Sequence, residues 1–137
     1  MRATVEMFLP DKAFGFCETA EAERFYFHVE AFDRGPVGGP PPVLGEEVEI
    51  EGVKPCDGRC PKARIVRRLQ EPARQRARVR SFDPNAGWGF VAMTDGSACF
   101  LHTSDFVTPS VVSMGMAVEF YVGHRRGRPR ACYVTVE

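Results

Sequence analysis

The sequence predicts an all-β protein made of two tandem, five-stranded antiparallel barrels. Its 137 residues include 11 Phe, 3 Tyr, 13 Gly and 11 Pro. This composition is typical of short strands joined by tight turns. A shift of 74 residues also aligns 3–32 with 77–106 without a gap. The chain therefore contains two copies of one structural unit.

The repeat has eight identical pairs over the aligned stretch. They are Ala3/Ala77, Val5/Val79, Phe8/Phe82, Pro10/Pro84, Gly15/Gly89, Phe16/Phe90, His28/His102 and Phe32/Phe106. We expect the two domains at 1–69 and 76–137. Residues 70–75 are the predicted linker, because Pro and polar residues interrupt the strand pattern there.

Alternating apolar residues and turn signals predict five strands in each copy. In the first copy they fall near 3–9, 13–18, 24–30, 46–52 and 61–67. In the second copy they fall near 77–83, 87–92, 98–103, 116–122 and 130–136. Five strands in about 65 residues protect both sheet edges only if the sheet closes on itself. The prediction is thus a small Greek-key barrel of the OB type in each copy.

The third strand of each copy is apolar on both faces, and its histidine indicates which face meets solvent. The residues expected inside are Phe25, Phe27 and Val29 in the first copy and Cys99, Leu101 and Thr103 in the second. The residues expected outside are Tyr26 and His28, and Phe100 and His102. The second strand adds an outward pair of rings to each copy, with a glycine between them that leaves the rings room. These pairs are Phe14 with Phe16 and Trp88 with Phe90.

Outward-facing rings predict a surface on which nucleic-acid bases stack. Stacking of a base on an aromatic side chain contributes about 1–3 kcal/mol and works for every base. The alternative is that one ring pair turns inward and fills the core, as aromatic residues of strands commonly do.

At these positions the sequence resembles the cold-shock domain family, small OB barrels that bind single-stranded RNA and DNA. The first family motif, Lys-Gly-Phe-Gly-Phe-Ile, is similar to residues 12–17 and 86–91. The second motif, Val-Phe-Val-His-Phe, is similar to 25–29 and 99–103. The closing Gly-x-x-Pro-x-Ala is similar to 58–63, and its second copy is one residue shorter. Both motifs in order, twice in one chain, make a specific combination.

The rings and the resemblance together predict twelve nucleic-acid-binding residues. They are Phe8, Lys12, Phe14, Phe16, Tyr26 and His28 in the first copy, and Arg80, Phe82, Trp88, Phe90, Phe100 and His102 in the second. The family's exposed Trp of the first strand is replaced by Met7 and Ser81. Residues 1–69 carry 10 Lys/Arg and 12 Asp/Glu, whereas 70–137 carry 8 and 6. We therefore expect the second copy to bind more strongly.

The predicted function is single-stranded RNA or DNA binding through these faces, with RNA-chaperone activity or cold-shock-like gene regulation. The alternative is a degenerate tandem module that acts mainly in protein–protein interaction, favoured by the missing Trp and by Glu6 at a position where the family has a cation. No catalytic residue and no enzyme activity are expected, because the three histidines lack a nucleophile or carboxylate at an interpretable spacing. No cofactor, metal or small-molecule substrate is expected, since Cys56 and Cys60 lack a second ligand pair.

We expect a cytoplasmic monomer in which the two copies form a pseudo-dimer. The sequence has no apolar run of about 18 residues and no signal core, so no membrane partner is expected. Five scattered cysteines do not form a disulfide framework. The arginines between 64 and 80 have two interpretations: a track for phosphates that joins two sites, or a solvated strand edge and linker.

Overall fold

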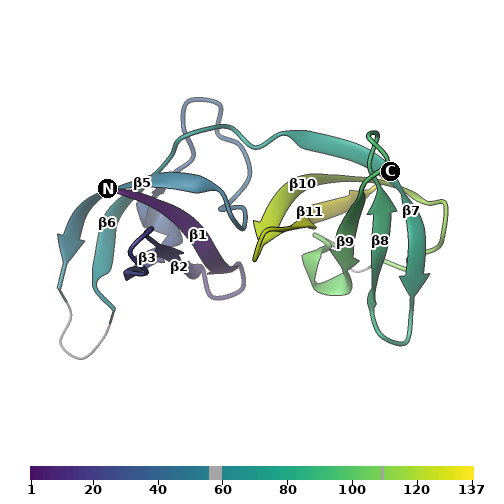
Figure 1. Cartoon of the computed structure of the whole chain (residues 1–137), viewed down its shortest axis with the longest axis horizontal. Helices are drawn as coiled ribbons and strands as arrows, with labels where there is room; N and C mark the ends of the chain where they lie inside the picture. The colour runs from purple at the N-terminus through teal and green to yellow at the C-terminus, as the bar shows by residue number, and fades with distance from the viewer. Residues whose placement is uncertain (56–59, 109) are drawn as a thin grey trace. The chain divides into compact units, whose positions relative to one another are not determined.

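The computed structural model describes residues 1–55, 60–108 and 110–137, and it divides the chain into two compact units (Figure 1). The first unit is Met1–Pro72 and the second is Ala73–Glu137. Both are built almost entirely of strands, so the predicted all-β class is confirmed.

The first unit is a closed five-stranded barrel with one short additional strand. Its elements are β1 (Arg2–Leu9), β2 (Phe14–Glu18), β3 (Arg24–His28), η1 (Val29–Ala31), β4 (Phe32–Asp33), β5 (Glu47–Lys54) and β6 (Lys62–Arg68). Neighbouring strands follow the order β3-β2-β1-β5-β6, and a β3–β6 pairing closes the ring. The two-residue β4, which the sequence pattern does not predict, pairs in parallel with β6.

The second unit is a closed barrel of the same design. Its elements are β7 (Arg74–Asp83), β8 (Trp88–Ala92), β9 (Ala98–His102), η2 (Thr103–Asp105), β10 (Ala117–Arg125) and β11 (Arg128–Val136). The order β10-β11-β9-β8-β7 closes through β7 and β10. Strand β7 begins inside the predicted linker, because Arg74 and Gln75 pair with Tyr121 and Phe120 of β10.

Each barrel encloses its own apolar core. In the first unit Phe27 is completely buried among residues such as Val5, Val48 and Val66. In the second unit Phe120 and Leu101 occupy the centre. Burial of each such side chain stabilises the fold by about 1.5–3 kcal/mol. The inward orientation predicted for Phe25, Phe27, Cys99 and Leu101 is confirmed.

Two residues predicted to face inward lie outside the strands. Strands β3 and β9 end at a histidine whose Nδ1 accepts a backbone N–H two residues later, at 3.1 Å in the first unit and 3.0 Å in the second. This local hydrogen bond competes with continuation of the strand and starts a 3₁₀ turn. Val29 is consequently only half-buried and Thr103 is exposed, so the prediction was wrong for both residues.

A β-bulge interrupts the first strand of each unit. The register shifts between Val5 and Met7 in β1 and between Val79 and Ser81 in β7. The extra residue reverses the alternation of side chains beyond it. The bulge also brings a backbone carbonyl close to the glycine of the opposite strand. A Cβ at Gly15 would lie 2.2 Å from the Met7 oxygen, and one at Gly89 would lie 2.0 Å from the Ser81 oxygen. The glycine is therefore required by the neighbouring backbone, and not by the rings beside it as the sequence suggested.

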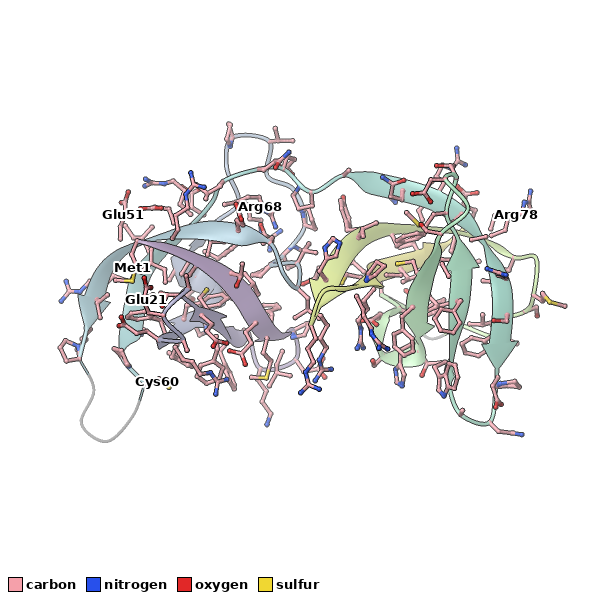
Figure 2. The ribbon with its side chains drawn as sticks, in the orientation of Figure 1. Met1, Glu21, Glu51, Cys60, Arg68 and Arg78 are labelled. Carbon is pink, nitrogen blue, oxygen red and sulfur yellow. The ribbon has the colours of Figure 1, made fainter. Side chains whose placement is uncertain are left out.

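A buried ion pair fixes the Pro-rich segment of the first unit. The Arg68 guanidinium, labelled in Figure 2, donates to both Glu46 carboxylate oxygens at 2.7 and 2.9 Å and to the Pro41 carbonyl oxygen at 3.1 Å. It also lies over the Phe32 ring, 5.0 Å from the ring centroid. Charge-assisted hydrogen bonds of this kind hold the segment before β5 against the barrel.

Candidate nucleic-acid interface

The strand register defines one outward face on each barrel. Residues directly opposite in an antiparallel pair point to the same side of the sheet. Phe14 is paired with Leu9 and His28, and Phe16 is paired with Met7 and Tyr26. The first ring face is therefore composed of Met7, Leu9, Phe14, Phe16, Tyr26 and His28. By the same pairing, the second ring face is composed of Ser81, Asp83, Trp88, Phe90, Phe100 and His102.

Three rings touch one another on the first ring face. Phe14 and Phe16 meet edge to face, with centroids 6.1 Å apart and planes at 87°. Tyr26 lies 5.4 Å from Phe14 and 5.9 Å from Phe16. All three are half-buried, so each keeps part of its surface open to solvent. Neither Phe14 nor Phe16 turns into the core, so the alternative interpretation was wrong for this pair.

The second ring face repeats this arrangement. Trp88 and Phe90 meet edge to face at 6.0 Å and 87°. Phe100 lies 6.2 Å from Trp88 with planes at 29°, and 6.0 Å from Phe90. His102 continues the row, 6.3 Å from Phe100 with planes at 29°. Trp88 is the most open ring of the set, at 43% exposure.

The structure does not bring Phe8 and Phe82 to these faces. Beyond the bulge they are paired with Gly15 and Gly89, so they point inward. Phe8 stacks on the buried Phe27 with centroids 6.2 Å apart and planes at 12°. Phe82 packs against the second core. Their predicted position among the stacking rings was wrong, because simple alternation does not include the extra residue of a bulge.

Two predicted cations lie at the borders of the faces. Lys12 is exposed in the turn before β2, and Arg80 is exposed at the bulge of β7. Within the described parts of the chain neither side chain has an ion-pair partner. Both are therefore available to a nearby anion.

Each face also has an arginine that the sequence prediction omitted. Arg24 lies over Phe16, 5.0 Å from its centroid, and is paired with Glu6 at 3.1 Å. Glu18 neighbours this pair, and its pKa is raised, first through a hydrogen bond with Glu6 and then through repulsion from that carboxylate. The first ring face thus has an acidic border at one end. The sequence shows Glu6 itself, but its contacts with Arg24 and Glu18 depend on strand pairing and are not visible in the sequence.

The second face holds its arginine in a more buried ion pair. Arg130 lies 5.4 Å from the Phe100 centroid, and its Nε donates to Asp105 Oδ2 at 2.8 Å. Burial raises the pKa of Asp105 more than the Arg130 guanidinium lowers it. Asp83 is occupied as well, because its Oδ1 accepts the backbone N–H groups of Asn85 and Ala86. Both carboxylates of this face therefore have structural partners.

The two histidines have one defined tautomer when neutral. Since Nδ1 of His28 and of His102 accepts a backbone N–H, the ring proton belongs on Nε2. Each face consequently ends in a hydrogen-bond donor beside the rings. Such a donor suits the carbonyl oxygens and ring nitrogens of bases.

Most arginines of the 64–80 stretch have partners within the protein. Arg67 pairs with Asp33 and Glu51, and Arg68 is buried against Glu46. Arg74 and Arg76 both pair with Glu119, and Arg78 donates to the Gly115 carbonyl at 3.0 Å. These contacts favour a solvated strand edge over a continuous phosphate track.

The described residues include no cluster of His, Cys, Asp or Glu that suits a metal ion. The possible zinc pair cannot be placed, because Cys56 lies outside the described residues. Burial raises the pKa of the Cys17 thiol to about 12 and that of Cys99 to about 11, so both are poor nucleophiles. In the part of the chain that the structure describes, no helix is long and apolar enough to cross a membrane.

Residues 75–137 match the family described as the 'Cold-shock' DNA-binding domain. Among solved structures, the chain is similar to Drosophila Unr CSD456, with 15% identity, a TM-score of 0.45 and coverage of 99% of this chain and 60% of that one. It is also similar to a multidomain protein with nucleic acid binding domains from Streptococcus pneumoniae, with 14% identity, a TM-score of 0.35 and coverage of 99% and 50%.

No curated protein is significantly similar to the chain in sequence. The chain spans 60% and 50% of the length of the two solved chains. The family match covers nearly the whole second unit, including its ring face, and supports nucleic-acid binding in general. The second unit therefore matches the cold-shock domain family over residues 75–137, and the first unit is a barrel of the same topology.

Proposed function

We propose that the chain binds single-stranded RNA or DNA through its two ring faces and carries out no catalytic step. The observation that carries this proposal is the repeated triad of rings, each with two edge-to-face pairs and with ring centroids between 5.4 and 6.2 Å apart. Bases released from a duplex expose flat surfaces that stack on such rings. Paired bases lack this access, so the faces favour single strands.

The emission of Trp88 tests the proposal, since it is the one Trp in the sequence and belongs to the second ring face. Titration with oligo-dT or oligo-U is expected to quench this emission. A duplex of equal length should quench it much less. Unchanged emission together with no shift in a gel assay would refute single-strand binding by the second unit.

An RNA-chaperone role follows from the preference for unpaired bases. A protein that binds only the open strand shifts the equilibrium of a hairpin toward opening, by mass action. We propose this activity for a monomeric chain in the cytoplasm. A hairpin with a fluorophore and a quencher should open when the chain is added, and a variant with Trp88→Ala and Phe100→Ala should open it far less. Sedimentation and cell fractionation test the other two points.

The first ring face also supports a second candidate function, the binding of a protein. Met7 and Leu9 extend its three rings with apolar side chains, whereas the second unit has Ser81 and Asp83 at these positions. Replacement of Phe14 and Phe16 by Ala separates the two functions. Loss of a copurifying protein with unchanged oligonucleotide affinity would favour the protein-binding function.

A further inference from the structure

A basic hollow adjoins the histidine end of the first ring face. Its lining is composed of His28, Glu30, Ala31, Lys54, Lys62 and Arg64. His28 belongs both to this lining and to the ring face, where it is paired with Phe14. Lys62 is the parallel partner of Tyr26, which places β6 directly beside the rings. The rings and the hollow therefore form one continuous surface.

The hollow combines three cations with a single carboxylate, that of Glu30. Lys62 and Arg64 are exposed, and within the described residues no acid lies at ion-pair distance from either. The Arg64 stem packs over Gly52, where a Cβ would lie 3.1 Å from Arg64 Cδ. This packing restricts a flexible side chain at the rim of the hollow.

The second unit shows what would neutralise such a site. Arg130 takes the place of Lys62, because it is the parallel partner of Phe100 as Lys62 is of Tyr26. Asp105, which neutralises Arg130, has Ala31 as its repeat equivalent in the first unit. At these two equivalent positions the first unit keeps a cation, Lys62, and has an alanine, Ala31, where the second unit has an acid.

The charges of the first ring face separate along its strands. Glu18 and Arg24 are opposite each other at one end of the β2–β3 pair, where Glu6 adds a second carboxylate. Phe14 and His28 are opposite each other at the other end, next to the hollow. A polyanion that stacks on the rings is repelled at the first end and attracted at the second.

We propose that the hollow holds backbone phosphates of a single strand whose bases stack on the first ring face. The proposal rests on the proposed function and extends it, since the first unit becomes a second binding site despite its acidic composition. Lys62 and Arg64 contact the phosphates, and the strand leaves the ring face at His28. The acidic border of Glu6 and Glu18 is left unoccupied.

The test uses the full chain with its second face disabled by Trp88→Ala, Phe90→Ala and Phe100→Ala. Binding of a fluorescein-labelled oligo-dT is followed by anisotropy at several salt concentrations. Addition of Lys62→Gln and Arg64→Gln should weaken binding roughly tenfold at low salt. It should also reduce the slope of log K against log salt by about 0.7 for each lost phosphate contact.

A matched control removes two other positive charges of the same unit, with Arg2→Gln and Arg67→Gln. Both side chains are exposed and already paired with carboxylates, at 3.8 Å to Glu47 and 2.6 Å to Glu51. The control should lower the slope by less than half as much. Equal effects of the two double variants would overturn the proposal, as would unchanged affinity of the Lys62/Arg64 variant.

Failure of the proposed function gives a different pattern. If the wild-type chain binds no oligonucleotide, both proposals fail. If the wild-type chain binds but the variant without the second face does not, the second unit alone binds, and the first ring face and its phosphate site are refuted while single-strand binding by the chain stands. Circular dichroism of every variant confirms that the barrels remain folded.

Discussion

The two units share their inward positions and differ at the borders of their outward faces. Both have a bulge in the first strand, a glycine opposite it, and three rings in nearly the same mutual geometry. At the border, Glu6 corresponds to Arg80 and Ala31 corresponds to Asp105. Packing limits what the barrel interior accepts, whereas border residues change the ligand's electrostatic environment without affecting the fold.

This comparison shows that net charge alone does not describe how each face meets a phosphate. The second unit is more basic, yet Arg130 is already paired with Asp105. Its exposed cations include Arg80 at the β7 bulge and Arg125, Arg126 and Arg128 at the β10–β11 turn. The first unit is acidic on average but concentrates Lys62 and Arg64 beside its rings. Local arrangement, and not the total charge, decides which phosphates a face can hold.

The largest expected effect tests whether the two interiors are equivalent. Gly15→Ala and Gly89→Ala should each destabilise their own unit by about 3 kcal/mol, since the new Cβ meets a backbone carbonyl that cannot move away freely. Thermal unfolding followed by Trp88 emission reports the second unit, and far-ultraviolet circular dichroism reports both. Gly96→Ala is the control, because Gly96 has a φ of 88° but open space around it. Gly96→Ala should lower the free energy of unfolding by only about 1–2 kcal/mol. Equal losses of stability in Gly89→Ala and Gly96→Ala would contradict the steric explanation.

The next effect compares the two ring faces as stacking surfaces. Trp88→Ala should raise the Kd for oligo-dT roughly tenfold, the loss expected from one stacked base. Trp88→Phe keeps a ring and should recover most of the affinity. Phe14→Ala should have a smaller effect, because the indole of Trp88 is larger and more exposed. Anisotropy of a labelled oligonucleotide measures all three variants. A larger loss from Phe14→Ala would make the first unit the principal site.

A smaller effect is expected when the first unit receives the acid of the second. Ala31→Asp places a carboxylate in the hollow beside Lys62. Binding by the first face should weaken a few-fold, and the salt slope should fall by up to about 0.7, because one cation is neutralised. In the control Ala31→Asn, the new side chain is nearly as large as that of Asp but carries no charge. This variant should bind like the wild type. Equal weakening by both variants would indicate a steric effect.

The sequence predicts the architecture well because the repeat and the strand periodicity are local signals. Ten barrel strands lie close to their predicted ranges, and Phe27 and Leu101 are buried as expected. The errors share one cause, which is hydrogen bonding of the backbone. The bulge turns Phe8 inward, and the His28 and His102 hydrogen bonds end their strands early. Neither feature changes the hydrophobic pattern from which the strands are predicted.

The binding surface is less predictable than the fold because its charges depend on pairing between distant segments. Arg24 reaches Phe16 only through the β2–β3 register, and Lys62 reaches Tyr26 only through the barrel closure. The arginines after Lys62 look like a phosphate track in sequence, yet Arg68 is buried against Glu46. A count of charges along the chain does not distinguish these situations.

The smallest expected effect concerns the Asp105–Arg130 pair. Because burial raises the folded-state pKa of Asp105 above its value in the unfolded chain, the folded second unit retains the proton to higher pH. The contribution of this group to stability is therefore fully present below pH 3.8, its unperturbed pKa, and is lost as pH rises through the folded-state pKa. Asp105→Asn removes this dependence. The difference in Tm between wild type and variant should change by at most a few degrees between pH 7 and pH 4, in the direction that favours the wild type at low pH.

The same substitution also tests the comparison between the units. Since Asp105→Asn releases the Arg130 guanidinium from its ion pair, the second unit should acquire the open cation that the first unit has in Lys62. The salt slope of oligo-dT binding should become steeper by up to about 0.7. Asp95→Asn, in the exposed turn between β8 and β9, removes an equal charge without touching the Arg130 ion pair and serves as the control. If both variants steepen the salt slope equally, the effect comes from the change in net charge. The Asp105–Arg130 ion pair would then not explain a difference between the two faces.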